Sequence, residues 1–385
     1  MSSNIKKNGG IPSLSQLKKS DLEYYLFFII IEIAEAMNKG ANNKTVFLFS
    51  ITAIFFLCYK LIRSRYRHTE LLIVLLLGAL SALIFYNTKK IGGILSIIAL
   101  LGLKGVDTRK LLKLSFYLRS ITFIIVVSLT SIGILHNAKL IHIRGDSSVI
   151  RYSMGFSHPN QFHLAFIIIL LLYLYFYFQK INAIHITVLC LLNFLIYQKS
   201  FSRTSCIIGF FAIFMMVWFR SNVLCKLKNF VCYSILPIGF IVSIVPALLY
   251  DKTGLIRKVD RLLQWRITFG RHYLEQYPIN LFGNNLRNDT IVLDSGYIEL
   301  IINYGIIFTF LYVIAYLILI HRFVKNRNYR ELLLVVCFLS YGVTEAFIPN
   351  LFANVSMIFI GELIFPVKIK ESMASNKINK EKYLA

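Results

Sequence analysis

Long apolar stretches alternate with short polar segments along most of the chain. A helix that crosses a bilayer needs about 20 mostly apolar residues, with about 17 as the practical lower limit. By this measure the pattern predicts an all-α polytopic membrane protein with about twelve spans, because lipid cannot satisfy the polar groups of an open backbone. The first span carries Glu32 and Glu35 and the fourth is short, so these two fit the pattern least well. The spans are expected at 21–38, 45–62, 70–87, 90–103, 114–135, 161–178, 181–198, 204–219, 229–250, 295–320, 331–348 and 351–367.

The remaining segments define the predicted organisation. A polar tail at 1–20 precedes an integral membrane domain at 21–367, and a second tail follows at 368–385. Within the domain, the polar segments 136–160 and 251–294 exceed the length of about 12–15 residues beyond which loops are usually functional or disordered. Both are rich in large apolar residues, which favours order. No strand alternation or internal repeat is visible in the sequence.

Composition and charge agree with this class. Hydrophobic residues make up 57% of the chain and charged residues 16%, against about 25% charged in ordinary soluble domains. The net charge is +24, but the basic residues lie in short clusters between apolar runs, whereas a nucleic-acid-binding protein gathers them on one exposed face. Membrane lipid is therefore the expected surrounding, and nucleic acid is excluded as a partner.

The distribution of the 42 lysines and arginines predicts the orientation. If the N-terminus faces the cytoplasm, most of them fall on the cytoplasmic side, as the positive-inside rule requires. Both termini are then cytoplasmic, and 136–160 and 251–294 face outward. The first 20 residues lack the apolar core of a cleavable signal, so the first span is expected to act as an uncleaved signal. The six cysteines form no CxxC pair, which argues against a disulfide framework or a zinc–thiolate site.

The second outer segment has helical periodicity from 255 to 277, with one apolar and one basic face. A helix of this kind can rest on the membrane surface with its basic residues toward lipid phosphates. Arg266, however, lies on the apolar face, where a guanidinium is costly to bury unless an anion meets it. It either extends back to water or points inward at an anionic ligand or partner. Pro278 ends the helix and Gly270 opens its inner face, which favours the inward direction, whereas His272 falls on the polar face.

The first outer segment ends in RYSMGFSHPN at 151–160, directly before the sixth span. Pro159 disfavours helix at His158, and Asn160 is a natural N-cap for the incoming helix. Arg151 and His158 are then expected at the outer mouth of the bundle, although His158 is equally compatible with a simple turn.

Three further charged residues lie near predicted outer ends. Arg203 stands in the short segment before the eighth span, where it contacts either a lipid headgroup or another anion. Asp294 opens the tenth span, where the helix dipole alone explains a carboxylate. Glu345 lies near the outer end of the eleventh span, at a depth where ionisable groups are functional candidates.

These residues suggest a common chemistry. Arg151, Arg203 and Arg266 come from three outer segments, and arginine is suited to bidentate binding of phosphate. A nearby carboxylate or histidine can deprotonate a hydroxyl. The sequence has no HExxH, P-loop or nucleophile elbow, so it offers no support for metal- or nucleotide-dependent chemistry or for a cofactor. Since the outer face lacks nucleotide sugars, a donor there must already be activated, as a polyprenyl-pyrophosphate-linked saccharide is.

Four segments then resemble a known family. RYSMGFSHPNQ at 151–161, SFSRTS at 200–205, LLQWRITFGRHYLEQYPINLFG at 262–283 and LDSGYIELIINYGII at 293–307 are similar to the bacterial repeat-unit polymerases of capsule, exopolysaccharide and O-antigen synthesis, the Wzy family. The resemblance implies a glycosyltransferase-C-like fold in the bacterial cytoplasmic membrane. It implies transfer of a growing glycan from one undecaprenyl pyrophosphate to a sugar hydroxyl of a new lipid-linked repeat unit, without a metal. Flippase and chain-length regulator proteins are the implied partners.

The resemblance also assigns roles. Arg151, Arg203 and Arg266 would bind pyrophosphate. Related O-antigen ligases carry a histidine where this chain has Asp294, so Asp294 is the first candidate for the base, with His158 and Glu345 behind it. Further substrate contacts are expected from Asn160, whose alternative role is the helix cap, and from Tyr297. A flippase for lipid-linked oligosaccharides and a ligase-type glycan transferase remain as alternative functions.

Overall fold

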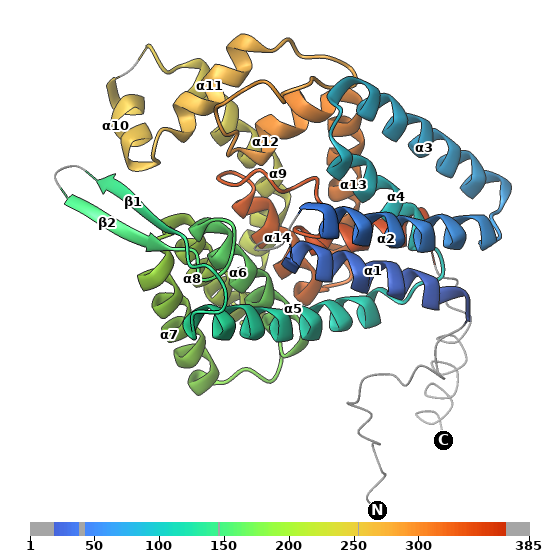
Figure 1. Cartoon of the computed structure of the whole chain (residues 1–385), viewed down its shortest axis with the longest axis horizontal. Helices are drawn as coiled ribbons and strands as arrows, with labels where there is room; N and C mark the ends of the chain where they lie inside the picture. The colour runs from blue at the N-terminus through green and yellow to red at the C-terminus, as the bar shows by residue number, and fades with distance from the viewer. Residues whose placement is uncertain (1–18, 38–42, 145–146, 253, 367–385) are drawn as a thin grey trace, which may run out of the picture.

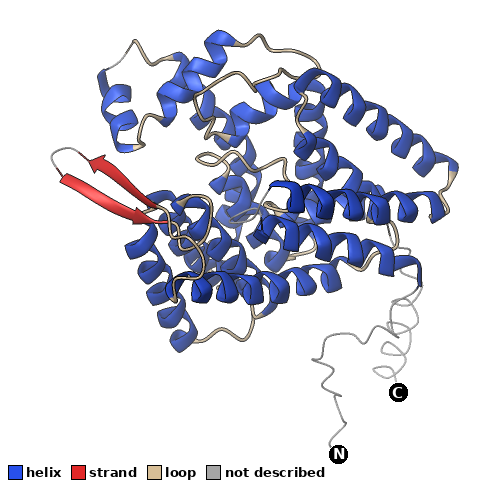
Figure 2. Cartoon of the chain, viewed as in Figure 1, coloured by secondary structure: helices blue, strands red, loops and turns tan. Residues whose placement is uncertain are grey.

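The computed structural model describes residues 19–37, 43–144, 147–252 and 254–366, and nearly all of its regular structure is helical (Figure 2). The predicted helical class is therefore confirmed. The predicted C-terminal tail and residues 1–18 lie outside the described residues. In chain order the helices are α1 (Lys19–Met37), α2 (Asn43–Arg63), α3 (His68–Thr88), α4 (Ile91–Gly102), α5 (Thr108–Ser131), α6 (Pro159–Phe176), α7 (Ala183–Ser200), α8 (Arg203–Arg220), α9 (Cys225–Leu248), α10 (Gly254–Leu262), α11 (Arg266–Gln276), α12 (Gly296–Glu299), the π-helix η2 (Leu300–Tyr304), α13 (Gly305–Lys325), α14 (Tyr329–Tyr341), the 3-10 helix η3 (Val355–Met357) and α15 (Ile358–Ile364).

Within the described residues, seven helical segments are long and apolar enough to cross a membrane. They are α3, α5, α6, α7, α8, α9 and the continuous run of α12, η2 and α13. Several expose much of their apolar surface, as lipid-facing helices do: Leu72 of α3 and Ile124 of α5 are more than half exposed. The chain is thus a helical protein with the properties of a membrane protein.

Two predicted spans are shorter in the structure. The helix expected at 331–348 ends at Tyr341, and within the described residues 351–366 of the last expected span the helices are the short η3 and α15. Between the end of α14 and the start of η3 the backbone runs through turns. There the buried Asn354 amide donates to the carbonyl of Ile348 at 3.0 Å. The Asn354 side chain thus supplies the hydrogen bond that a helix would otherwise give to this carbonyl. Non-helical backbone is tolerated at membrane depth where protein surrounds it. The hydropathy of this region reflects burial inside the protein.

The segment 136–160, which is predicted to face outward, contains two strands where the sequence predicts none. Strand β1 (Lys139–Arg144) pairs antiparallel with β2 (Ser147–Tyr152), with Leu140 opposite Arg151. The hairpin projects beyond the helices, on the same side of the view as α10 (Figure 1). The all-α prediction failed here because apolar residues occur on both faces of these short strands, for example Leu140 and Ile141, so no alternation marks them.

Helix α14 forms the centre of the molecule (Figure 1). Every residue from Leu332 to Leu339 is inaccessible to solvent. It packs against α6, α8, α9 and α13. A helix that is apolar on all sides is stable in such an enclosed position, and its C-terminal end delivers Glu345 to the predicted outer side.

Three acidic residues of the first apolar stretch, Asp21, Glu23 and Glu32, have basic partners on neighbouring helices. Glu32 of α1 pairs with the guanidinium of Arg119 in α5, which also donates to the carbonyl of Phe352. Near the start of α1, Asp21 pairs with Lys60 at 3.4 Å and Glu23 with Arg63 at 3.0 Å, both from α2. These contacts explain how α1 packs in an apolar setting despite its charges, since buried charges require partners.

Candidate active site

The amphipathic segment of the second outer loop folds as two helices rather than one. Residues Gln264 and Trp265 adopt left-handed backbone angles (φ 60° and 65°), which separate α10 from α11. The turn is stabilised by buried Asp260, whose carboxylate accepts from the backbone N–H of Ile267 at 2.8 Å and from the hydroxyl of Thr268. An aspartate at this place satisfies helix N–H groups that have no partner within the helix. The predicted continuous helix is therefore wrong, and Arg266 becomes the first residue of α11.

Arg266 points inward, between two carboxylates. Its Nη2 donates to Oε1 of Glu345 at 3.1 Å, and its Nε lies 3.7 Å from Oδ2 of Asp294. Only 12% of the side chain is exposed, and its buried Nη1 has no hydrogen-bond partner among the described residues. Gly270, one turn further along α11, allows this approach, because a Cβ there would lie 2.7 Å from Ile298 Cδ1. Arg266 therefore retains one donor for an anion.

Asp294 and Glu345 are held together by the backbone around them. The N–H of Gly296 donates to the carbonyl of Gly342 at 2.9 Å, and a Cβ on Gly296 would lie 2.2 Å from Ile348. This close approach joins the start of α12 to the segment after α14. Burial raises the pKa of the Asp294 carboxyl, and the charge of Arg266 opposes that rise. A carboxylate with a raised pKa is better matched to accepting a proton near neutral pH.

The first outer segment reaches the same place. Asn160 donates from Nδ2 to Oε1 of Glu345 at 3.4 Å, and its Oδ1 accepts from Nη2 of Arg151. Arg151, 6% exposed on β2, also donates from Nε to the carbonyl of Ser200 at 2.8 Å. Arg151, Asn160, Glu345, Arg266 and Asp294 thus form one continuous line of polar contacts, which we call the polar line. It joins the hairpin, α6, the segment after α14, α11 and the segment that leads into α12, where Asp294 precedes the N-cap Ser295.

His158 lies next to the polar line and caps α6. Its Nδ1 accepts from the backbone N–H of Asn160 at 3.1 Å, with Pro159 as the first helical residue. Burial lowers the pKa of His158, and the nearby charge of Arg151 lowers it further. The expected capping role of Asn160 is therefore wrong. The histidine caps the helix, which leaves the Asn160 amide to join Arg151 and Glu345.

Besides His158, two predicted site residues, Arg203 and Tyr297, lie outside the polar line. Arg203 is the first residue of α8 and is exposed, and it forms no ion pair with the described residues. Tyr297 is fully buried, where its hydroxyl donates to the carbonyl of Leu339 at 2.9 Å and its ring packs against Phe240. The structure thus gives Tyr297 a packing position and does not bring Arg203 to the carboxylates.

A buried polar network behind Arg151 was not identified from the sequence. His163 of α6 makes hydrogen bonds of 3.0 Å with the Ser200 hydroxyl and 3.1 Å with the Asn193 side chain. All three residues are inaccessible to solvent. Because Arg151 donates to the carbonyl of Ser200, this network fixes the end of α7 against which Arg151 rests. His163 is a polar residue within a predicted apolar span, and this is the sequence signal that could have indicated the network.

A cavity of about 230 Å³ opens beside Arg266. Apolar side chains of α9 and α10 form most of its wall, among them Pro246 and Val259, and Arg266 and Ser295 also line it. The hydroxyl of Ser243 is also buried there, with no hydrogen-bond partner among the described residues. The guanidinium therefore stands where an apolar space meets the polar line.

Comparison of the chain with protein-family models, with characterised proteins and with solved structures finds no match.

Proposed function

We propose that this protein is a metal-independent glycosyltransferase that polymerises undecaprenyl-pyrophosphate-linked oligosaccharide repeat units on the outer face of the bacterial cytoplasmic membrane. The observation that carries the proposal is the placement of Arg266 between Asp294 and Glu345, with Arg151 joined to the same line through Asn160. Anion-binding and proton-accepting groups thus occur together, at one end of the helices.

In the proposed reaction, a sugar hydroxyl of the new repeat unit attacks the anomeric carbon of the growing glycan. A carbon–oxygen bond forms as the bond from that carbon to the pyrophosphate breaks, and the electron pair leaves with the pyrophosphate oxygen. The hydroxyl proton passes to a carboxylate, for which Asp294 is the first candidate. Its raised pKa suits a general base.

The arginines stabilise the leaving group. The free Nη1 of Arg266 can donate to a pyrophosphate oxygen, and negative charge on that oxygen increases as the bond breaks. Arg151 is held rigidly by Ser200 and Asn160 and adds a second positive charge. The apolar cavity beside Arg266, between α9 and α10, would receive the isoprene units of the donor that lie next to its pyrophosphate.

The geometry favours an enzyme over a flippase. A transporter places its substrate site near the middle of the membrane and moves between two openings. Here the polar line lies where α6, α11 and α12 begin, at helix ends that the charge distribution assigns to the outer side. The glycosyltransferase-C-like fold, the assembly with flippase and chain-length regulator proteins, and the full set of about twelve spans belong to the same proposal.

The proposal is tested in cells that lack the gene and carry variants of it. Arg266→Ala is expected to abolish high-molecular-weight glycan while single lipid-linked repeats accumulate in the outer leaflet. Arg257→Ala, at an exposed arginine of the same outer segment, is the matched control and is expected to leave chain length unchanged. Normal polymer in Arg266→Ala at normal protein level contradicts the proposal. Repeats that stall in the inner leaflet of the deletion strain indicate a flippase, and polymer formed without the protein indicates a ligase.

A further inference from the structure

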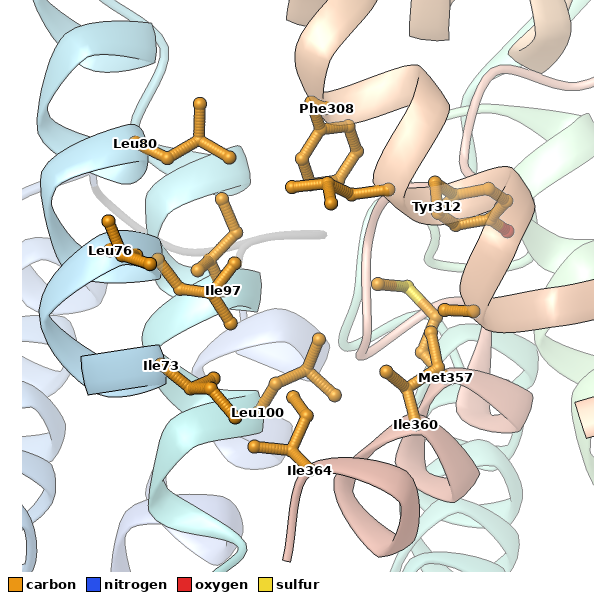
Figure 3. A pocket seen from close by; sticks show the side chains of 13 residues that line it. Ile73, Leu76, Leu80, Ile97, Leu100, Phe308, Tyr312, Met357, Ile360 and Ile364 are labelled. Atoms are coloured by element: carbon orange, nitrogen blue, oxygen red, sulfur yellow. The ribbon is translucent and has the colours of Figure 1, made fainter. Parts of the chain in front are cut away.

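A second, larger apolar cavity lies away from the polar line. Its volume is about 340 Å³, and α3 and α4 form one wall while α13, η3 and α15 form the other. Figure 3 shows the side chains of the two walls facing each other across an open space. The lining is apolar apart from the hydroxyl of Tyr312, and the exposed side chains of Leu76 and Leu311 lie along it. We call this cavity the α3–α13 groove.

The outer end of the groove carries three cations. Lys89 and Lys90 connect α3 to α4, and Arg287 of the second outer segment donates from Nη2 to the carbonyl of Lys89. Lys90 pairs with the buried carboxylate of Glu299 at 2.6 Å. Lys89 and Arg287 are exposed and form no ion pair with the described part of the chain. Three cations against one carboxylate leave a positive charge at this end.

Aromatic side chains connect the cations to the groove. The ammonium group of Lys90 lies 6.0 Å from the centre of the Tyr304 ring, and that ring lies 5.1 Å from the ring of Phe308. Phe308 lines the groove at the same end as Leu80, near the end of α3 that leads to Lys89 (Figure 3). Cations therefore stand at one end of an apolar channel, an arrangement complementary to a lipid with an anionic head.

We propose that the α3–α13 groove and the cations Lys89, Lys90 and Arg287 bind the acceptor substrate's carrier, with part of the polyprenyl chain in the groove and the pyrophosphate at the cations. This inference rests on the proposed function. Polymerisation requires two lipid-linked substrates, and the cavity beside Arg266 accommodates one of them.

The chemistry of the two substrates decides which one binds here. The donor's pyrophosphate is attached to the reacting carbon, so it must lie at the polar line beside the base. The acceptor reacts through a hydroxyl on its terminal sugar, so its own pyrophosphate is separated from the reacting atoms by the rest of the repeat unit. A remote cationic site is therefore needed for the acceptor alone. α12 separates the two sites, since Asp294 precedes it and Glu299 ends it.

The binding test uses the whole protein in lipid nanodiscs and a farnesyl pyrophosphate that carries a photoreactive group at the end of its isoprenoid chain. Labelled peptides are mapped by mass spectrometry. We expect labelling on α3, α4 or α13 within the groove, and competition by undecaprenyl pyrophosphate. Replacing both exposed cations, Lys89→Ala with Arg287→Ala, is expected to weaken this labelling at least about tenfold, because two charge-assisted contacts are lost. Lys90 is left intact because Glu299 depends on it.

Two further variants control the binding test. Ala315→Phe fills the groove with its cations intact and is expected to remove the labelling. Lys258→Ala, at an exposed cation of α10, is expected to leave it unchanged. Absence of label from the groove overturns the inference. Labelling that survives the double replacement, or that phosphatidylglycerol displaces as well as undecaprenyl pyrophosphate does, also overturns it, because either result describes an ordinary lipid site.

A kinetic measurement assigns the groove to the acceptor. In reconstituted polymerisation with a fixed donor, the Lys89→Ala, Arg287→Ala protein is expected to show a raised KM for the lipid-linked acceptor and an unchanged kcat. A raised KM for the donor instead contradicts the assignment. The two proposals fail separately: if Arg266→Ala polymerises normally but the groove is labelled, the polymerase proposal falls while a polyprenyl pyrophosphate site remains.

Discussion

The ion pair between Arg266 and Glu345 gives a prediction that separates folding from chemistry. Both side chains are almost enclosed, at 12% and 10% exposed, and Nη2 lies 3.1 Å from Oε1. Arg266→Ala leaves Glu345 and Asp294 near each other without the positive charge that contacts both of them. Removing one partner of a buried ion pair typically costs about 3–5 kcal/mol, so we expect a loss of free energy of unfolding near the lower end, since Asp294 is partly exposed.

A second substitution should restore the fold without restoring activity. In Arg266→Met with Glu345→Gln, a neutral pair of similar volume replaces the ions, and such replacements are often neutral or stabilising. Thermal unfolding of the purified protein in detergent, followed by tryptophan fluorescence, measures the difference. Arg266→Ala should melt several degrees lower, and the double variant should melt close to the natural protein. Polymerisation should be lost in both.

Two results of these melting and polymerisation measurements would contradict the prediction. If Arg266→Ala melts at the natural temperature, the guanidinium is not part of a buried ion pair, and the geometry of the site is wrong. If the double variant is stable and still polymerises, the pair is structural and the catalytic proposal fails.

Three other predictions follow from the site. Because burial raises the pKa of Asp294, the rate of polymerisation should increase as pH rises through that raised pKa and the carboxyl loses its proton. Asp294→Asn should lower kcat by about 10²–10⁴-fold and remove this pH dependence. A pH profile that is identical in both proteins contradicts the role of Asp294 as the base. Asp260→Ala removes the cap of α11 and should lower the free energy of unfolding by about 1–2 kcal/mol, with faster hydrogen exchange at the Ile267 amide. Asp260→Asn keeps an acceptor and should lower the free energy of unfolding by less. Equal exchange in the natural protein and both variants rejects the cap. Arg151→Lys keeps the charge, but a lysine cannot contact the Ser200 carbonyl and Asn160 together. The KM for the donor should therefore rise while the melting temperature changes little. An unchanged KM argues against a contact between Arg151 and the substrate.

Hydropathy and charge predicted the class of the protein well, because long apolar helices leave a strong signal in sequence. They predicted lengths less well. The region after Tyr341 is as apolar as a span, but its backbone groups are satisfied by contacts such as the one from Asn354 to Ile348. Hydropathy cannot distinguish residues buried in lipid from residues buried in protein, so it predicts that the helix ends at 348 instead of at Tyr341.

Part of the candidate site was also predictable. A single arginine on an apolar helix face needs an anionic neighbour, which predicts that Arg266 points inward. The structure places it between the carboxylates of Asp294 and Glu345. The break between α10 and α11 was not predictable from periodicity, because it depends on Asp260 folding back to bind Ile267. The hairpin was missed for a similar reason: its strands are short and have no alternating pattern.

Pairings between distant segments lay beyond the sequence. Nothing local in Asn160 indicates that its amide reaches both Arg151 and Glu345, which comes 185 positions later. The same limit explains Arg203, whose basic outer position resembled that of the other two arginines although the structure leaves it exposed.

The most direct test of the proposed function uses the purified protein in liposomes with a single defined lipid-linked repeat unit and no other protein. The proposal predicts a ladder of glycans that differ by one repeat, formed in the presence of a metal chelator, with one undecaprenyl pyrophosphate released for each new linkage. Movement of the repeat unit across the bilayer without a ladder and without released pyrophosphate would contradict it.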